Sequence, residues 1–237
     1  IAGCVADLAV MLDVLISHHP ADPTSRNTPA PGLVASLANP GHRPQLGRLG
    51  GIFAERADSE TISAVDAAMA AWESAGAGAG NPQLPASFEE VLDHHRIVLV
   101  SGLAANHRDH YPDHADRYPE GLGGLIAEGL DFRMTRFIEA RRHQMRLKAE
   151  IRDCFGECDV LVCPAAVGGA PDTSTTGDPS MNAPWSYTGL PTVSFPIGRT
   201  ADGLPLSVQL VGRPDGETGL FQAAAWCEDT WSAAQTS

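Results

Sequence analysis

Apolar residues that alternate near the C-terminal end constrain the fold more than any other feature of the chain. They stand at every second position around a turn at residues 200–203, and they are Val193, Phe195, Ile197, Leu204, Leu206, Val208 and Leu210. A period of two places such side chains on one face of a strand, and the Asp202-Gly203 pair favours a tight turn. The sequence therefore predicts a β-hairpin. Because burial of each side chain contributes about 1.5–3 kcal/mol, we expect the hairpin to belong to a central sheet and not to a free edge.

Apolar runs and helical periodicity elsewhere predict an α/β fold. Residues 159–163, which precede Pro164, are typical of a buried strand, and residues 47–54 of a second, short one. Ala and Gly alternate over residues 75–80, which predicts a turn or a flexible connector. Helices are expected over residues 5–16, 59–74, 87–106, 131–155 and 217–230.

Two of the expected helices begin at residues that suit a helix start. Asp58 is a favourable N-cap, because its carboxylate can accept a hydrogen bond from a free backbone N–H of the first turn. Ser87 with Glu90 three residues later matches a capping box, in which the two side chains and the backbone satisfy each other. We therefore expect well-defined starts at both positions.

The charge balance excludes two classes of protein. With 16 basic and 29 acidic residues among 237, the chain has a formal net charge of −13. Nucleic-acid binding and polybasic membrane anchoring both need clustered Lys and Arg, so we expect neither kind of partner. The longest apolar stretch, residues 97–105, is about half as long as a membrane span requires. Five cysteines without a secretion signal favour free thiols, and we expect a cytoplasmic protein.

The helix expected over residues 131–155 carries seven of the basic side chains. Apolar residues recur along it at helical spacing, and they are Met134, Ile138, Met145 and Ala149. This pattern predicts a buried apolar stripe beneath a solvated basic face. Lys148, the only lysine in the chain, is then a surface residue.

Common catalytic and metal-binding motifs are missing from the sequence. It has no Gly-x-Ser-x-Gly elbow, Ser-x-x-Lys pair, phosphate-binding loop or His-Glu-x-x-His motif. His107, His110 and His114 have spacings that could supply metal ligands, but Pro112 interrupts the helix that would align them. The adjacent pairs at residues 18–19 and 94–95 are expected on the surface. We therefore expect no metal site and no cofactor.

Five segments between residues 159 and 212 resemble the amidase signature hydrolases. They are DVLVCP at 159–164, TGDP at 176–179, NAPWSYTGLP at 182–191, PIG at 196–198 and DGLPLSVQLVG at 202–212. Their order and spacing are similar to those in the C-terminal half of such amidases. Residues 1–9 likewise resemble the segment just downstream of the family's catalytic core, with Gly3 and Cys4 where relatives have Arg and Ser or Thr. The resemblance is weak and generic over residues 20–130.

The resemblance implies a mixed, twisted β-sheet flanked by helices, here incomplete, with residues 1–237 as the C-terminal portion of a single domain. The family works with a Ser nucleophile, a second Ser in a cis peptide and a Lys base, and it hydrolyses amide bonds by acyl transfer. The chain has no Gly/Ser-rich run and no adjacent serines, and Lys148 lies downstream of the family's lysine. We therefore expect no catalytic residue in this chain, which alone should be inactive.

The segment from Asp178 to Tyr187 holds our candidates for substrate binding. It is polar and aromatic, and it precedes the hairpin near the expected end of the sheet, where ligand pockets are common. The candidates are Asp178, Asn182, Trp185 and Tyr187, and the ligand would be a small-molecule amide. The other interpretation of Trp185 and Tyr187 is that they fill the core.

Two other functions agree with the same residues. One is a non-catalytic binding or assembly module derived from an amidase scaffold, and the other is an A-type subunit of a tRNA amidotransferase. Without the missing half, an exposed sheet edge and apolar face would favour self-association, of which a homodimer is the simplest form.

Overall fold

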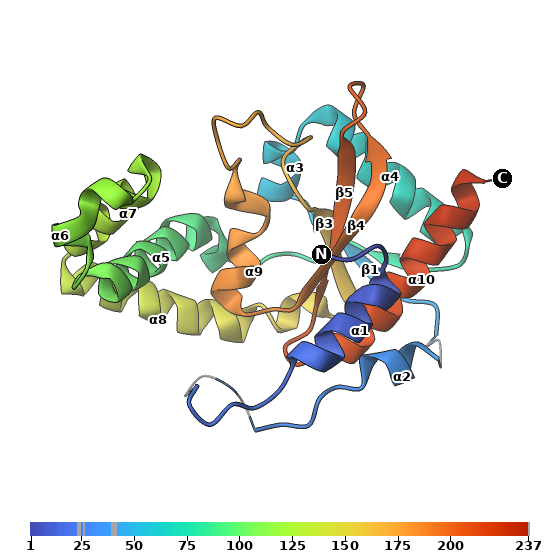
Figure 1. Ribbon diagram of the computed structural model, residues 1–237. Coiled ribbons are helices and arrows are strands. Elements are labelled where there is room, and N and C mark those ends of the chain that lie inside the picture. The colour runs from blue at the N-terminus through green and yellow to red at the C-terminus, as the bar shows by residue number, and fades with distance from the viewer. Residues whose placement is uncertain (23–24, 26, 39–41, 237) are drawn as a thin grey trace.

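A computed structural model describes residues 1–22, 25, 27–38 and 42–236 of the chain. Five strands form one sheet in the order β2-β1-β3-β5-β4 (Figure 1). The strands are β1 (Gln45–Arg48), β2 (Gly78–Gly80), β3 (Val160–Pro164), β4 (Thr192–Arg199) and β5 (Pro205–Gly212). β2, β1 and β3 are parallel, whereas β3, β5 and β4 are antiparallel. The expected mixed sheet is therefore confirmed.

The predicted hairpin is present as β4 and β5. Val193 pairs with Leu210 and Phe195 with Val208, and Gly203 in the turn has a φ of 83°. β5 lies inside the sheet, but β4 forms one edge of it within the described residues. The prediction that the whole hairpin avoids an edge is therefore wrong for β4.

The segment around β1 and β2 differs from its prediction. The strand expected at residues 47–54 is shorter and ends at Arg48, and residues 52–56 form helix α3 (Ile52–Arg56). Residues 78–80 are not a connector but the edge strand β2, parallel to β1. A Cβ atom at Gly78 would collide with the side chain of Gln45. Glycine here permits close strand contact, so the prediction of a flexible connector is wrong for these residues.

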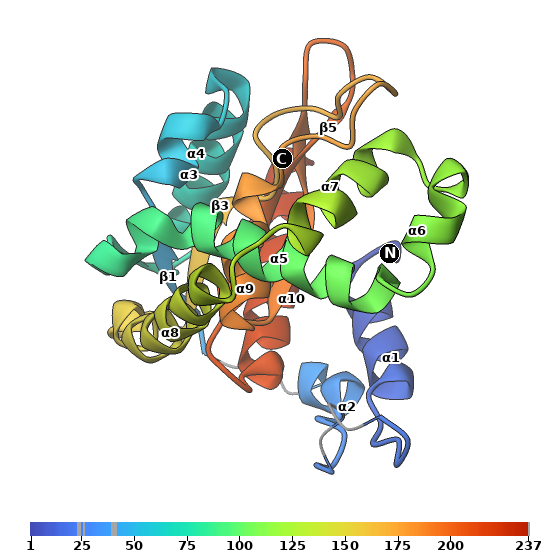
Figure 2. The ribbon, with the colours of Figure 1, turned by 90° about the vertical axis from the view of Figure 1, so that its left-hand side faces the viewer.

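Helices cover both faces of the sheet (Figures 1 and 2). The helices of four or more residues in the described chain, besides α3, are α1 (Val5–Leu15), α2 (Leu33–Leu37), α4 (Ser59–Ser74), α5 (Val91–His107), α6 (Tyr111–His114), α7 (Glu120–Leu130), α8 (Met134–Glu150), α9 (Ala183–Thr188) and α10 (Glu217–Gln235). Short 3₁₀ turns are η1 (Ala86–Glu90), η2 (Ala115–Arg117), η3 (Asp153–Phe155) and η4 (Pro179–Met181). No helix in the described part is long and apolar enough to cross a membrane.

Each face of the sheet has its own core. The first, which we call the α4/α10 core, contains Trp72, Val160, Val162 and Cys227. The second, the α8/α9 core, contains Leu147, Leu161, Cys163 and the aromatic residues of α3, η1 and α9. Successive residues of β3 thus alternate between the two cores, which explains why this strand is buried throughout, as predicted.

Helix starts agree with prediction at one position and not at the other. Asp58 caps α4, because its carboxylate accepts a hydrogen bond from the Thr61 N–H at 2.7 Å. The capping box at Ser87 is wrong, since residues 86–90 form η1 and the Ser87 hydroxyl donates to the Glu150 carboxylate instead. At α1, where Cys4 makes no side-chain cap, the Glu228 carboxylate of α10 accepts from the Val5 N–H at 2.9 Å.

Helix α8 buries the opposite face from the one predicted. The side chains of Met134 and Met145 are 71% exposed, and Ile138 and Ala149 also face solvent. The buried residues are Ala140, His143, Gln144 and Leu147. His143 and Gln144 can be buried because Tyr187 of α9 supplies their hydrogen-bond partners, which no periodicity in α8 reveals. Lys148 is exposed, as expected.

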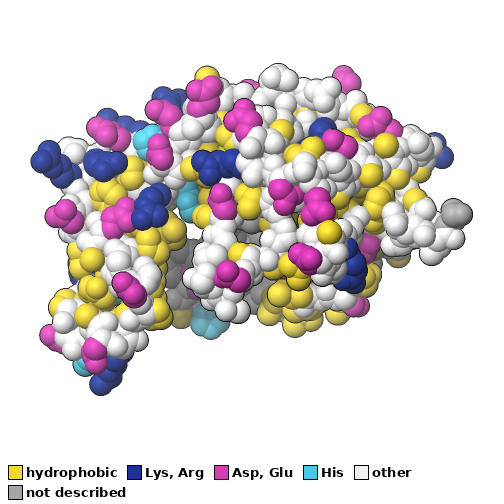
Figure 3. Space-filling view, turned by 90° about the horizontal axis from the view of Figure 1, so that it is seen from above, with side chains coloured by type: hydrophobic (Ala, Val, Ile, Leu, Met, Phe, Trp, Pro, Cys, Tyr) yellow, Lys and Arg dark blue, Asp and Glu magenta, His cyan; other side chains and the backbone are white. Residues whose placement is uncertain are grey.

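Charges of both signs are interspersed with apolar side chains on the surface seen from above (Figure 3). The five cysteines are free thiols, as predicted, with Cys163 and Cys227 buried. The surface placement predicted for the histidine pair on α5 is wrong. His94 and His95 are both partly buried, because α8 and α9 pack against this side of α5.

Candidate functional site

An open cavity of about 650 Å³ lies beyond the end of β3. Its wall is the loop that follows this strand, together with the start of η4 and the residue before α9. The lining residues are Ala166, Val167, Gly168, Gly169, Ala170, Pro171, Thr175, Thr176, Gly177, Asp178, Asn182 and Pro205. Two of the four candidates from the sequence, Asp178 and Asn182, therefore meet at one cavity.

Asp178 is held at the cavity wall by two kinds of contact. Its Oδ1 accepts a hydrogen bond from the Ser180 N–H at 2.7 Å, and its Oδ2 lies 3.4 Å from Nη1 of Arg56. The Ser180 N–H, and to a smaller degree the Arg56 guanidinium, lower the pKa of the Asp178 carboxyl group. Asp178 is therefore an anion at neutral pH.

Asn182 is oriented through both ends of its amide. Its Nδ2 donates to the Ala165 carbonyl at 3.1 Å, and its Oδ1 accepts from Nε2 of Gln209 at 2.8 Å. Gln209 lies on β5 and is only 2% exposed, so it provides a rigid support. A primary amide has two N–H groups and one remains available on Asn182. Because Asn182 lines the cavity, this N–H is a candidate donor to a ligand carbonyl.

Trp185 and Tyr187 lie in the α8/α9 core and do not line the cavity. Each is 2% exposed. Trp185 stacks on Phe53 with the ring centroids 5.3 Å apart, and the Tyr187 hydroxyl donates to the Ala140 carbonyl at 2.7 Å. Their positions agree with the core-filling interpretation. A contact of either side chain with substrate stays a prediction.

Arg56 and Gln209 are site residues that the sequence analysis missed. Arg56 is 122 residues from Asp178 in the chain, and no local pattern connects them. Gln209 had a signal, because it interrupts the apolar run of a strand that is buried from Val208 to Gly212. A buried amide inside a strand needs a partner, and Asn182 is that partner.

The residues that line the cavity, all of which lie in the described part of the chain, include no Lys, His or Cys. Cys163 lies on the neighbouring strand β3, but burial raises the pKa of its thiol to about 12, so it is not an available thiolate. The cavity can bind and orient a polar ligand through Asp178 and Asn182. The hydroxyl groups of Thr175 and Thr176 also line it, with no Lys or His among the lining residues to activate them.

Comparison with known proteins identifies the family. Residues 1–221 match the amidase family over nearly the whole chain. The chain belongs to the amidase signature family. The amidase resemblance of the sequence segments between residues 159 and 212 is thereby confirmed, and so is the family's mixed sheet.

Curated relatives of this amidase family member include two kinds of protein. The A-type subunit of the glutamyl-tRNA(Gln) amidotransferase from Thermosynechococcus vestitus is 26% identical in an alignment of 266 positions that covers 97% of the chain and 54% of that protein. An amidase of Pseudomonas putida is also 26% identical, over 98% of the chain and 53% of its own length. The chain thus spans about half the length of the curated relatives it matches.

Solved structures share the fold over the same extent. A chain of the vestigial protein complex that reveals the evolutionary origins of an s-triazine catabolic enzyme superposes with a TM-score of 0.84 at 23% identity, covering 97% of this chain and 52% of that one. The 6-aminohexanoate cyclic dimer hydrolase bound to its substrate gives a TM-score of 0.77 at 21% identity, with coverage of 97% and 54%. At these identities the likeness establishes the fold alone.

Proposed function

We propose that this chain is the C-terminal half of an amidase domain that hydrolyses a carbon–nitrogen amide bond. The observation that carries the proposal is the match of nearly the whole chain to about half of each relative. The cavity agrees with it, because the residues that line it can bind a ligand but include no Lys, His or Cys. The Ser nucleophile, the second Ser and the Lys base of the family would then be supplied by residues outside 1–237. The Ser attacks the amide carbonyl, the amine leaves, and water hydrolyses the acyl-enzyme.

In this proposal the cavity binds a small-molecule amide, and the catalytic residues outside 1–237 act on it. Asn182 would donate its free N–H to the substrate, and Gln209 keeps the amide in the required orientation. Asp178 fixes the loop through Ser180 and Arg56. Free thiols and the charge balance support a cytoplasmic enzyme without nucleic-acid or membrane partners.

Two experiments test the proposal. The purified 237-residue chain should release no ammonia or amine from a panel of aliphatic and aromatic amides. If the purified chain did hydrolyse an amide, and a substitution within the chain abolished that activity, the proposal that the catalytic residues lie outside 1–237 would be contradicted. The coding sequence upstream of Ile1 should contain a Gly/Ser-rich stretch with a preceding Lys in the same reading frame, whereas a start codon beside Ile1 would favour the non-catalytic module.

Substrate contacts are tested in the protein that includes the upstream segment. We expect Asn182→Ala to raise KM by about 3–10-fold, the value of one lost hydrogen bond, with the unfolding midpoint nearly unchanged. Ser186→Ala is the matched control, because Ser186 is exposed on α9 and does not line the cavity. Trp185→Ala should lower stability if Trp185 only fills the core, and should raise KM in a stable protein if it contacts substrate.

A second candidate is an A-type subunit of a tRNA amidotransferase. The amidotransferase relatives favour it, since they match the chain as well as the amidase does. Such a protein would associate with partner subunits, whereas a stand-alone amidase would not require them. Co-purification of defined partners with the full-length protein would support this candidate, and full amidase activity of the isolated protein would argue against it.

A further inference from the structure

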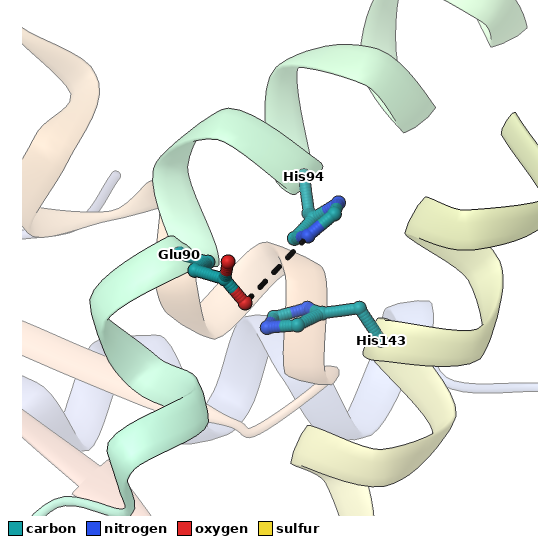
Figure 4. A group of neighbouring side chains, drawn as sticks. All are labelled: Glu90, His94 and His143. Carbon is teal, nitrogen blue, oxygen red and sulfur yellow. Dashed lines mark ion pairs between the residues drawn. The ribbon is translucent and has the colours of Figure 1, made fainter. Parts of the chain in front are cut away.

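Three side chains with metal-binding atoms meet between the start of α5 and α8 (Figure 4). Glu90 is the last residue of η1, His94 follows four residues later in α5, and His143 comes from α8. One donor atom from each of the three residues lies within 4.8 Å of the other two, and Glu90 Oε2 is 4.0 Å from His94 Nε2. Two histidines and a carboxylate are a common ligand set for zinc.

The hydrogen bonds of His143 supply an independent observation. The Tyr187 hydroxyl has one proton, which it donates to the Ala140 carbonyl at 2.7 Å. Its oxygen can then accept from Nδ1 of His143, 3.0 Å away, in the tautomer whose Nδ1 carries a proton. In a neutral ring Nε2 then has only a lone pair, yet it lies 2.8 Å from the Ser87 carbonyl oxygen, which cannot donate.

In the other tautomer, or in a doubly protonated ring, Nε2 donates to the Ser87 carbonyl. A metal ion on Nε2 would displace this carbonyl or take it as a further ligand. The ring would then have the usual arrangement of a metal-bound histidine, in which the other N–H is donated to an oxygen, here that of Tyr187. An NMR spectrum of the ring nitrogens distinguishes these forms.

We propose that Glu90, His94 and His143 bind a divalent transition-metal ion of the zinc type, which links the start of α5 to α8. Bonds of about 2.0–2.2 Å require the donor atoms to approach one another by less than about 1.5 Å from their present separations.

The site is accessible from solvent. The Glu90 side chain is 63% exposed and borders an open cavity that Pro85, Ser87, Arg146 and Glu150 also line. Nη2 of Arg146 lies 4.0 Å from Glu90 Oε2 and competes for this carboxylate. Its side chain is 56% exposed and can turn into solvent. The guanidinium is therefore expected to weaken binding without preventing it.

Cobalt and zinc titrations of the tag-free, chelator-treated 237-residue chain test the proposal. We expect one Co²⁺ per chain with visible d–d absorption, displaced by one Zn²⁺. Glu90→Gln and His94→Gln should each weaken Co²⁺ binding by more than about 10-fold, and Tyr187→Phe by about 10–100-fold as the partner of a ligand. Arg146→Gln should strengthen binding about five-fold, because it removes one like charge about 4 Å from the carboxylate.

Matched controls separate binding from folding. His95→Gln and His107→Gln each remove a histidine that is outside the group and should leave the affinity unchanged. Circular dichroism without metal reports whether each variant folds, and the exposed Glu90 keeps the test valid if His143→Gln does not fold. Stronger binding in Arg146→Gln cannot result from a damaged fold.

Three results would overturn the proposal. One is no binding of Co²⁺ or Zn²⁺ up to about 100-fold excess over the chain. Another is binding that Glu90→Gln and His94→Gln leave intact. The third is an NMR spectrum in which both ring nitrogens of His143 remain protonated in the presence of stoichiometric Zn²⁺.

Discussion

The two cores on either face of the sheet are built in different ways. The α4/α10 core is mainly apolar, and the indole N–H of its fully buried Trp72 donates to the Cys227 carbonyl at 2.8 Å. The α8/α9 side buries His143 and Gln144 between the helices, held by the side chain and the carbonyl of Tyr187. Apolar burial stabilises the first interface, whereas specific hydrogen bonds determine which face of α8 points inward.

The contrast explains where apolar periodicity works as a predictor. Where apolar packing alone stabilises an interface, the apolar positions of the sequence pattern are the buried positions of the structure, as in the hairpin and α4. A buried hydrogen-bonding network removes that coincidence, because the side chains that are buried are the polar ones and the apolar ones are left in solvent. The exposed Met134 and Met145 on α8 are the consequence.

The largest expected effect is in the α4/α10 core. Trp72→Ala removes a fully buried ring and its hydrogen bond, and we expect it to lower the free energy of unfolding by about 3–5 kcal/mol. Trp231→Ala is the control, because Trp231 is only partly buried at the margin of the same core. Urea unfolding followed by far-UV circular dichroism measures both. Equal losses would mean that the core does not depend on Trp72.

A middle-sized effect distinguishes the two faces of α8. Gln144→Leu leaves the Tyr187 carbonyl without its donor and should cost about 1–3 kcal/mol. Met145→Gln changes the next residue, which is exposed, and should change stability by less than about 0.5 kcal/mol. The same unfolding measurement applies. If Met145→Gln were the more damaging change, the apolar stripe predicted from the sequence would be the buried face after all.

The parts of the fold that could be predicted depend on neighbours in sequence. The hairpin, β3 and the Asp58 cap follow from residues a few positions apart, and each is present. β2 was missed because residues 78–80 pair with β1, more than thirty residues earlier. No short pattern carries such a contact.

The candidate site shows the same difference between residues that are close in sequence and residues that meet only in the folded chain. Asp178 and Asn182 were found through family segments, and the structure brings them to one cavity. Arg56 and Gln209, which hold them, come from α3 and β5 and could be located only in three dimensions. Similarly, the Glu90, His94 and His143 group joins residues up to 53 positions apart, so the sequence analysis considered only His107, His110 and His114 as ligands and expected no metal site.

The buried thiols of the two cores should not change the stability near neutral pH, and their effect grows only above pH 9. Burial raises the pKa of Cys163 to about 12 from an ordinary value near 9, and it also raises the pKa of Cys227. Above pH 9 the unfolded chain loses these protons while the folded chain keeps them. The contribution of the two thiols to the free energy of unfolding is therefore fully present below pH 9 and falls as the pH rises toward 12. Unfolding free energies from pH 8 to pH 11 should therefore decline. In Cys163→Ala the free energy of unfolding should decline less steeply with pH than in the parent chain, because the titration of this one thiol is removed.

Thiol labelling of the folded chain separates the two cores in the same pH range. Cys163 and Cys227 should react only through opening of the structure, and therefore far more slowly than the partly exposed Cys4, Cys154 and Cys158. If the hydrogen-bonded α8/α9 side opens more readily than the apolar side, Cys163 will be labelled before Cys227. The reverse order would mean that the polar interface is the more rigid of the two, since both thiols are buried and differ mainly in the core that must open to expose them.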